Sequence, residues 1–440
     1  MDYRKRLSAL WPEKILGPRP GLKEMNFVCW GLFIGCVIIP LSVVLLAQFK
    51  GGAAFFLRSP VDFVYFYGIG KIADERSAIN VYDYSLQLQV FNEILPLDGS
   101  GIYGPSPYPP FVAEFFRLLA RLPFKYAYLL WTGISLVLYI AGIAFVIREF
   151  LPGDRLKSSL IFCLALAYYP FLISTLANGQ LSSVAVFFVG VALSLEKRSW
   201  PFFSGLALSM LTYKPTLLLL VLPMLLLTRR IRMLFGFVTG AGTLAVLSTL
   251  LAGGQIWPTY GSFLNSFGHT TGLYGHTSLR LWKYVDLNSS SYSVPGGRSR
   301  SILMILFCIV VVIAAWLSIL LWKSTNGGKP EQRLVWAATL TWTMLLNVYY
   351  PIYDTILVTI ALILTLSALK DLAWQYAADW IVCIAVLTFA VSWMTESVSK
   401  KYGLQPLTLL LITLAMGQAS ILHRVIRQRS LHGSSELLAI

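Results

Sequence analysis

Charged residues are scarce in this chain. Only 12% of its 440 residues are Asp, Glu, Lys or Arg, whereas a soluble domain has about 25%. Apolar residues make up 57%, above the roughly 45–50% of soluble domains, and the mean hydropathy is +0.69. So few charges cannot form a polar shell around so much apolar material. The composition therefore excludes a soluble globular protein and predicts an all-α polytopic membrane protein.

Cysteine is also sparse, and the positions of the cysteines favour neither metal binding nor disulfide formation. No two cysteines form a CxxC pair and none lies in a polar loop, so neither a disulfide framework nor a zinc site is expected. The five cysteines are Cys29, Cys36, Cys163, Cys308 and Cys383.

Long apolar runs occupy most of the chain. A helix needs about 20 apolar residues to cross the hydrocarbon core of a bilayer, which is about 30 Å thick. Eight runs are clear candidates, at approximately 27–49, 125–147, 233–252, 301–322, 334–350, 352–369, 378–395 and 405–423.

Two further runs are predicted to fold back as hairpins. The run 158–195 would be about 57 Å long as one helix, nearly twice the core thickness. The Asn-Gly-Gln sequence at 178–180 is its only polar, glycine-containing turning point. The run 201–228 is too long for one upright span, and a Lys-Pro pair at 214–215 lies at its middle. Because proline pushes the preceding residue out of helical geometry, we predict two short helices that meet at a recessed turn.

Most Lys and Arg residues fall on one side of the membrane when both runs are hairpins. That side also holds the N-terminal segment 1–26 and the tail 424–440, which the positive-inside rule makes cytoplasmic. The prediction is a transmembrane domain of about twelve helices over residues 27–423. The net charge of +15 then reports mainly topology, so nucleic acid is not expected as a partner.

Two long segments, 50–124 and 253–300, lie outside in this topology. Residues 77–95 of the first alternate apolar and polar positions as an amphipathic helix does. Residues 110–122 carry charges among apolar positions and are too short to span, so they are expected to lie in the outer interface.

Polar residues within or beside the apolar runs gather on this outer face. Ionisable residues in or near a membrane are functional candidates by default, and their convergence predicts one site. They come from the two outside segments, from both hairpin tips and from the start of 352–369. They are Asp62, Asn178, Gln180, Lys214, His269, His276, Arg280, Tyr353 and Asp354.

Several short motifs follow one another in a fixed order between residues 60 and 365. They are VDFVYFY at 61–67, NVYD at 80–83, YPPF at 108–111, NGQ at 178–180, YKP at 213–215, RR at 229–230 and YD at 353–354. In this order they resemble glycosyltransferase family 87, integral-membrane enzymes that include polyprenol-phosphate-mannose-dependent α-1,2-mannosyltransferases.

The resemblance implies a C-type glycosyltransferase fold, with its active site on the extracytoplasmic face of a bacterial inner membrane. It implies that the donor is a polyprenyl-phosphate sugar and that the transferred group is a hexosyl residue, mannosyl in the first instance. The acceptor is a hydroxyl group of a glycolipid or glycan, and the anomeric configuration of the sugar is inverted. In such enzymes an acidic residue early in the first outside loop takes the proton of the acceptor. Asp62 occupies that position.

The candidate residues suit this chemistry. The acceptor hydroxyl needs a general base, for which Asp62 serves, and the departing phosphate needs fixed cations. No D-x-D pair of the kind that holds a metal and a nucleotide sugar is present, so neither a metal nor a cofactor is expected. The expected ligands of the donor phosphate are Lys214, His269, His276 and Arg280. The expected substrate contacts are Tyr65, Tyr67, Tyr108, Asn178, Gln180, Tyr353 and Asp354.

Each candidate also has a purely structural interpretation. Asp62 could cap an interfacial helix, and Lys214 could extend to the lipid headgroups. Asn178 and Gln180 could simply close their turn. For the whole protein, the alternative function is a transporter or a flippase of lipid-linked glycans. A transporter is expected to show repeated halves and charges near mid-membrane, whereas this sequence shows no repeat and a one-sided cluster, which favours the enzyme.

Overall fold

The computed structural model describes most of the chain, and the described part is helical. Within it, the β contact is limited to an isolated bridge between Tyr284 and Pro351. The described residues are 22–38, 61–96, 103–270, 281–289, 329–347 and 349–437, together with positions 312 and 316.

The described α-helices are, in chain order, α3 (Leu22–Phe33), α6 (Val61–Glu75), α7 (Tyr84–Ile94), α8 (Pro110–Ala120), α9 (Phe124–Phe150), α10 (Arg155–Leu166), α11 (Ser182–Lys197), α12 (Pro201–Ser209), α13 (Val221–Leu227), α14 (Ile231–Ala252), α15 (Ile256–Thr270), α18 (Lys329–Leu345), α19 (Val358–Asp371), α20 (Gln375–Tyr402) and α21 (Pro406–Leu437). Shorter 3-10 or π-helical segments join them: η1 (Ile34–Ile38), η2 (Ala78–Tyr82), η3 (Pro170–Ala177), η4 (Met210–Tyr213), η5 (Pro215–Leu218), η6 (Leu281–Lys283) and η7 (Ile352–Leu357).

Five described helices are long and apolar enough to cross a membrane, and a sixth span results if α10 and η3 cross together across their 46° bend. The five are α9, α14, the continuous helix Ile352–Asp371, α20 and α21 as far as Gln428. They coincide with five of the predicted spans, and the helical structure of the described residues supports the predicted all-α membrane protein. The total of about twelve stays a prediction, because the span at 301–322 and part of the span at 27–49 lie outside the described residues. In addition, the predicted span at 334–350 corresponds to α18, which has 17 residues and is not among the five.

The first predicted hairpin is present. The chain leaves η3 at Ala177 and enters α11 at Ser182, and Gly179 between them adopts a left-handed φ of +77°. The far end of α11 lies beside the far end of α9, because Arg198 forms an ion pair with Glu149. The run 158–195 therefore returns to the end of the bundle at which it began.

The second predicted hairpin is also present. Helix α12 and η4 end before Lys214, whose φ of −142° and ψ of 84° are not helical, and η5 starts at Pro215. The return is shown by an ion pair of 2.7 Å between Arg230, the N-cap of α14 that follows α13, and Glu196, in the last turn of α11 that precedes α12. The break falls where proline was expected to force it.

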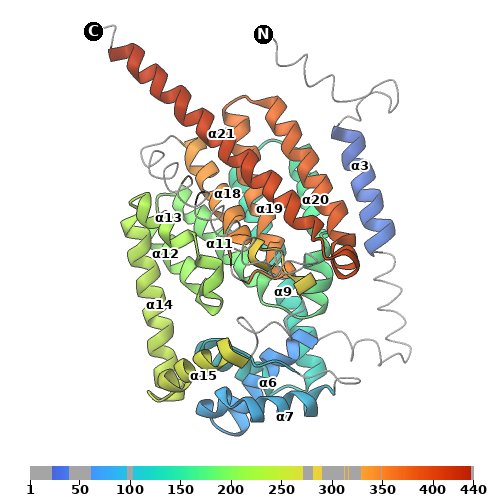
Figure 1. The fold of residues 1–440 in the computed structure, drawn as a ribbon, viewed down its shortest axis with the longest axis vertical. Helices are drawn as coiled ribbons and strands as arrows, with labels where there is room; N and C mark the ends of the chain where they lie inside the picture. The colour runs from blue at the N-terminus through green and yellow to red at the C-terminus, as the bar shows by residue number, and fades with distance from the viewer. Residues whose placement is uncertain are drawn as a thin grey trace.

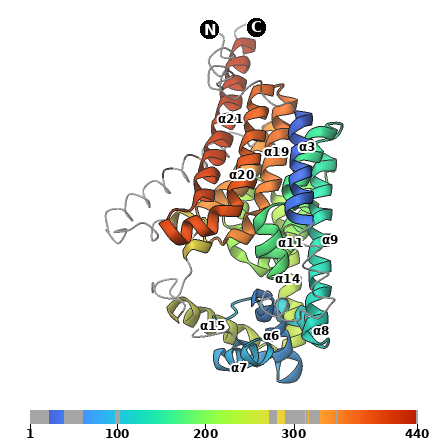
Figure 2. The same ribbon diagram turned by 90° about the vertical axis from the view of Figure 1, so that its right-hand side faces the viewer.

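The helices are arranged in two layers. Helices α6, α7, α8 and α15 lie together at one end of the molecule, at the bottom of Figures 1 and 2, and we call them the end layer. Helices α9 and α14 extend from the bundle to this layer (Figure 1). The segments 77–95 and 110–122, predicted to be interfacial helices, form η2, α7 and α8 here. An ion pair of 3.1 Å between Arg117 of α8 and Asp74 of α6 joins two of its helices.

Helices α12 and α14 cross in close contact through two glycines. A Cβ atom on Gly205 would lie 1.9 Å from the carbonyl oxygen of Met233, and one on Gly236 would lie 2.0 Å from that of Phe202. Because non-bonded atoms cannot approach so closely, both positions require glycine. Small residues at a crossing point are a common way for membrane helices to pack.

Substituting Gly236→Ala is expected to lower the free energy of unfolding by about 1–3 kcal/mol, because α14 must move away from α12. Gly242→Ala is the matched control in the same helix, since no heavy atom lies within 4 Å of the added Cβ. The control is expected to be neutral or slightly stabilising, as alanine is the better helix former. Thermal unfolding in detergent measures both, and equal effects would contradict this description of the crossing.

Candidate functional site

Asp62 lies in the first turn of α6, directly beside the tip of the first hairpin. The backbone N–H of the next residue, Phe63, donates to the carbonyl of Asn178 at 2.9 Å. A Cβ on Gly179 would lie 2.7 Å from the Cβ of Phe63, so the contact leaves no room for another side chain. The Asp62 carboxylate is partly exposed and makes no hydrogen bond or ion pair with the described residues. Its position is fixed by the backbone, which leaves its oxygens available to a ligand.

The hairpin tip itself is held by aromatic donors. Trp131 Nε1 donates to the carbonyl of Gly179 at 3.0 Å, and the Tyr128 hydroxyl donates to that of Ala177 at 2.6 Å. The side-chain amides of Asn178 and Gln180 form no hydrogen bond within the described part of the chain. Among the described residues, the turn is therefore closed without these amides.

Lys214 and Asp354, which are 140 residues apart in sequence, form an ion pair. Their side chains are 12% and 1% exposed, respectively, so the pair is almost completely buried. Ser182 Oγ donates to the other carboxylate oxygen of Asp354 at 2.7 Å, and Lys214 Nζ lies 4.6 Å from the ring centre of Tyr353. The expected phosphate ligand Lys214 is thus charge-compensated by an expected substrate contact. Sequence reasoning missed both this pairing and Ser182.

The recessed turn at Lys214 is attached to the segment that carries Asp354. Asn347, just after α18, donates from Nδ2 to the carbonyl of Thr216 at 2.8 Å. The Tyr350 hydroxyl donates to the backbone carbonyl of Asp354 at 3.1 Å. These bonds fix both partners of the ion pair to one rigid frame.

Tyr108 links the Asp62 side of the site to the Asp354 side. Burial raises the pKa of the Tyr108 phenol well above its usual range, and the carboxylate of Asp354, Tyr349 and the carboxylate of Asp62 raise it further, in that order. Both carboxylates are therefore within electrostatic reach of one half-buried side chain. Asp62 also acts on Tyr103. The pKa of the Tyr103 phenol rises to about 12, mainly through burial and secondarily through the carboxylate of Asp62.

The other two predicted tyrosines have structural contacts. The Tyr65 hydroxyl accepts a hydrogen bond from the backbone N–H of Gly104 at 3.1 Å, and its ring packs edge-on against Tyr103. The Tyr67 hydroxyl donates to the carbonyl of Leu122 at 2.9 Å. Tyr65 lies close enough to Asp62 for that carboxylate to contribute to the raised pKa of its phenol, after burial.

A short part of the second predicted outside segment, residues 281–289, packs against the site. Val285 N–H donates to the carbonyl of Tyr350, and the buried Asp286 accepts from the N–H of Tyr350 at 2.8 Å and from that of Ser289 at 2.7 Å. Sequence reasoning missed Asp286, although an Asp three residues before a Ser is a pattern that favours such a turn. His276 and Arg280 lie outside the described residues, as does the side chain of His269.

The buried carboxyl group of Asp286 is expected to make stability depend on pH. Burial raises its pKa from 3.8 to about 6, so the native state retains a proton that the unfolded chain loses. This contribution is complete below pH 4 and is lost as the pH rises through 6, by an amount on the order of 3 kcal/mol. The melting temperature of the protein should fall between pH 4 and 7 by a component that Asp286→Asn lacks. Identical pH profiles for the two proteins would contradict this role.

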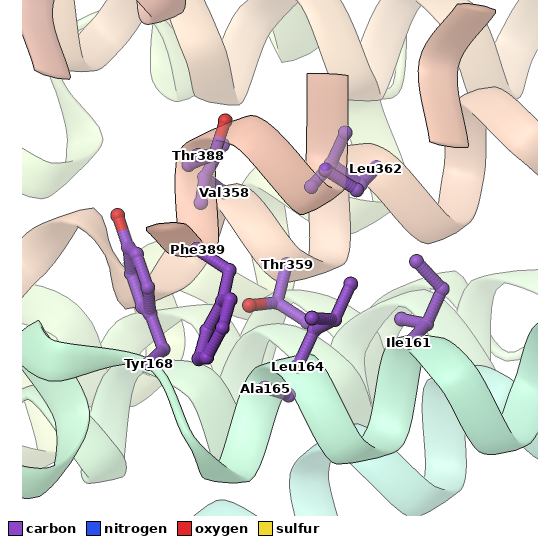
Figure 3. A pocket seen from close by; sticks show the side chains of 10 residues that line it. Ile161, Leu164, Ala165, Tyr168, Val358, Thr359, Leu362, Thr388 and Phe389 are labelled. Atoms are coloured by element: carbon purple, nitrogen blue, oxygen red, sulfur yellow. The ribbon is translucent and has the colours of Figure 1, made fainter. Parts of the chain in front are cut away.

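A small cavity elsewhere in the bundle is not suited to a sugar. Its volume is about 20 Å³, and it lies between α10, α19 and α20, where Leu164, Tyr168, Thr359 and Phe389 line it (Figure 3). This volume is enough for about one water molecule. In the described part of the chain, no group of three or more His, Cys, Asp or Glu residues could hold a metal ion.

Comparison with known proteins gives one match. A family model described as glycosyltransferase family 87 matches residues 107–348, more than half of the chain. The matched region contains Tyr108, the tips of both hairpins and Lys214, whereas Asp354 lies six residues after its end and Asp62 lies 45 residues before its start. No curated protein and no solved structure matches the chain.

Proposed function

The chain belongs to glycosyltransferase family 87, and from this premise we propose that it moves a hexosyl residue, mannosyl in the first instance, from a polyprenyl phosphate to an acceptor hydroxyl. Family membership makes it a membrane glycosyltransferase. The observation that carries the more specific proposal is the arrangement at the junction with the end layer. The carboxylate of Asp62, which has no partner among the described residues, and the carboxylate of Asp354, which holds the buried cation of Lys214, both act electrostatically on Tyr108.

Asp62 is the general base of this proposal. Its carboxylate takes the proton of the acceptor hydroxyl as the acceptor oxygen bonds to the anomeric carbon of the donor sugar. The bond between that carbon and the phosphate oxygen breaks, and its electron pair leaves with the polyprenyl phosphate. A single displacement of this kind inverts the anomeric configuration. The freedom of the Asp62 oxygens from other partners among the described residues supports this role.

Lys214 is the proposed ligand of the donor phosphate. An ammonium group has three N–H donors, and Asp354 occupies one of them. The remaining donors can contact a phosphate oxygen, on which negative charge grows as the sugar departs. Asp354 and Ser182 then serve to hold Lys214 in place. His269, His276 and Arg280 remain proposed helpers at this phosphate.

The amides and aromatic rings around the two charged groups are the proposed sugar contacts. Asn178 and Gln180 offer amides at the hairpin tip, and Tyr108 and Tyr353 offer ring faces. Tyr65 and Tyr67 complete the set, with their hydroxyl groups already bonded within the end layer.

The proposed topology places this site on the extracytoplasmic face of a bacterial inner membrane. It has about twelve helices in a C-type glycosyltransferase fold, with residues 1–26 and 424–440 in the cytoplasm. Basic residues at the opposite end, such as Arg198, Arg230 and Arg333, support this orientation by the positive-inside rule. A glycolipid or cell-envelope glycan is the proposed acceptor.

The purified full-length protein, incubated with radiolabelled polyprenyl-phosphate mannose and mixed acceptor lipids, tests the proposal. Labelled acceptor should form without added divalent metal, and nucleotide-activated mannose should not replace the donor. Labelled donor that crosses a vesicle membrane without any transfer would instead indicate a flippase. Transfer from the nucleotide sugar alone would contradict the proposed donor.

A further inference from the structure

A second and larger cavity lies at the opposite end of the bundle from the end layer. Its volume is about 390 Å³. It lies between the turn that joins α11 to α12, the turn that joins α13 to α14, and the start of α18. Figure 1 shows α12 and α13 beside the upper part of α14. Its lining includes Glu196, Ser199, Thr228, Arg230, Arg232 and Gln332. The proposed glycosyl transfer makes no use of this cavity.

Three helices start at this cavity. Pro201 is the first residue of α12, Arg230 is the N-cap of α14, and Gln332 lies in the first turn of α18. No side chain caps the N-terminus of α12 or of α14. The free N–H groups and the positive dipole end at the start of α14, together with the positive end of α12, favour an anion, whereas the first turn of α18 already carries the acidic Glu331.

The side-chain charges of the lining add to this preference. Glu196 is already occupied, since it pairs with Arg230 at 2.7 Å and accepts a hydrogen bond from Trp336 Nε1 at 2.7 Å. Arg232 forms no ion pair with any described residue and is exposed. Among the described residues, the guanidinium group of Arg232 is therefore left uncompensated, whereas the charges of Glu196 and Arg230 neutralise each other.

Large apolar side chains lie close in sequence to the lining residues. Each is within three positions of a lining residue and is more than half exposed. They are Trp200, Phe203, Leu226, Ile231 and Phe235. An apolar surface beside an anion site suits a molecule that has a charged head and acyl chains, whereas a soluble anion would gain nothing from it.

We propose that this cavity binds the phosphate headgroup of an anionic phospholipid. Arg232 and the N–H groups at the start of α14 contact the phosphate oxygens, Ser199 and Gln332 contact the glycerol portion, and the acyl chains lie along the apolar side chains of α12 and α14. Because the lining residues Pro201 and Thr228 lie at the two open ends of the hairpin that carries Lys214, a lipid bound between them stabilises that hairpin.

The test uses the full-length protein in an uncharged detergent. Dioleoylphosphatidylglycerol should raise the melting temperature in a saturable manner, and dioleoylphosphatidylcholine should not. Arg232→Gln should raise the half-saturating lipid concentration about tenfold, as expected for the loss of one charge-assisted contact. Arg229→Gln is the matched control, because it removes the same charge from an exposed neighbour that does not line the cavity. Native mass spectrometry, which counts retained phosphatidylglycerol molecules, gives a second readout if Arg232→Gln alters folding.

Three outcomes would overturn the proposal. Equal stabilisation by the two lipids would show that no anionic headgroup is selected. Equal losses in Arg232→Gln and Arg229→Gln would show attraction by the general surface charge alone. A shift of the same size with glycerol 3-phosphate or inorganic phosphate would show an anion site that takes no lipid.

Discussion

Replacement of Asp62 with Asn should lower the rate of sugar transfer by about 10²- to 10⁴-fold, the usual contribution of a general base. Asn has nearly the same shape but cannot accept the proton of the acceptor hydroxyl. The fold should survive, because Asp62 is held through the neighbouring backbone contact of Phe63 with Asn178 and its side chain makes no hydrogen bond with the described residues. The measurement is the initial rate with radiolabelled polyprenyl-phosphate mannose, together with the melting temperature.

Asp83→Asn is the matched control for this substitution. Asp83 lies in the same end layer and caps α7 by accepting from the N–H groups of Ser85 and Leu86. Asn is an equally good N-cap, so both stability and transfer should stay close to those of the unmodified protein. An Asp62→Asn protein that is folded and fully active would eliminate Asp62 as the base. Equal losses in both variants would point to a general effect of charge in this layer.

Replacement of Lys214 with Met should lower the free energy of unfolding by about 3–5 kcal/mol, the usual effect of removing one partner of a buried ion pair. The carboxylate of Asp354, only 1% exposed, would be left with the hydrogen bond from Ser182 as its main compensation. Thermal or denaturant unfolding in detergent measures this loss. Activity should also disappear, but that result alone would not separate a structural role from binding of the donor phosphate.

The double substitution Lys214→Met with Asp354→Asn separates the two roles. It removes both charges, and the amide oxygen that replaces the carboxylate can still accept from Ser182, so most of the lost stability should return. If Lys214 contacts the donor phosphate, the double variant should be stable but should lack transfer or need a far higher donor concentration. A stable double variant with normal kinetics for the donor would show that the pair is purely structural.

The positions at which the apolar runs fold back were predictable because they follow from local rules. A run of 38 residues cannot remain one span, and residues 178–180 offered the only polar turn with glycine. Similarly, Pro215 disfavours helical geometry at Lys214, and the structure shows the break there. The short helices near 77–95 and 110–122 were predictable from their length and mixed polarity.

The contacts of the site were not predictable in the same way. Lys214 and Asp354 each appeared as candidates, but nothing local indicates that residues 140 positions apart form an ion pair. The same limit applies to the contact of α6 with the first hairpin tip, which positions Asp62. Asp286 was overlooked because a single carboxylate in a polar segment is usually exposed, and only packing against Tyr350 buries it.

The sequence by itself therefore determined that this is a helical membrane protein, where its chain must turn, and which polar residues are candidates for chemistry. Composition and helix length decide these features residue by residue, because every apolar span must satisfy its backbone within the bilayer. Tertiary structure alone decided that Lys214 is charge-compensated while the carboxylate of Asp62 is left without a partner among the described residues. Such assignments depend on which helices come together in space, and the scarce charges of the chain, with their net excess of +15, do not show which of them are paired.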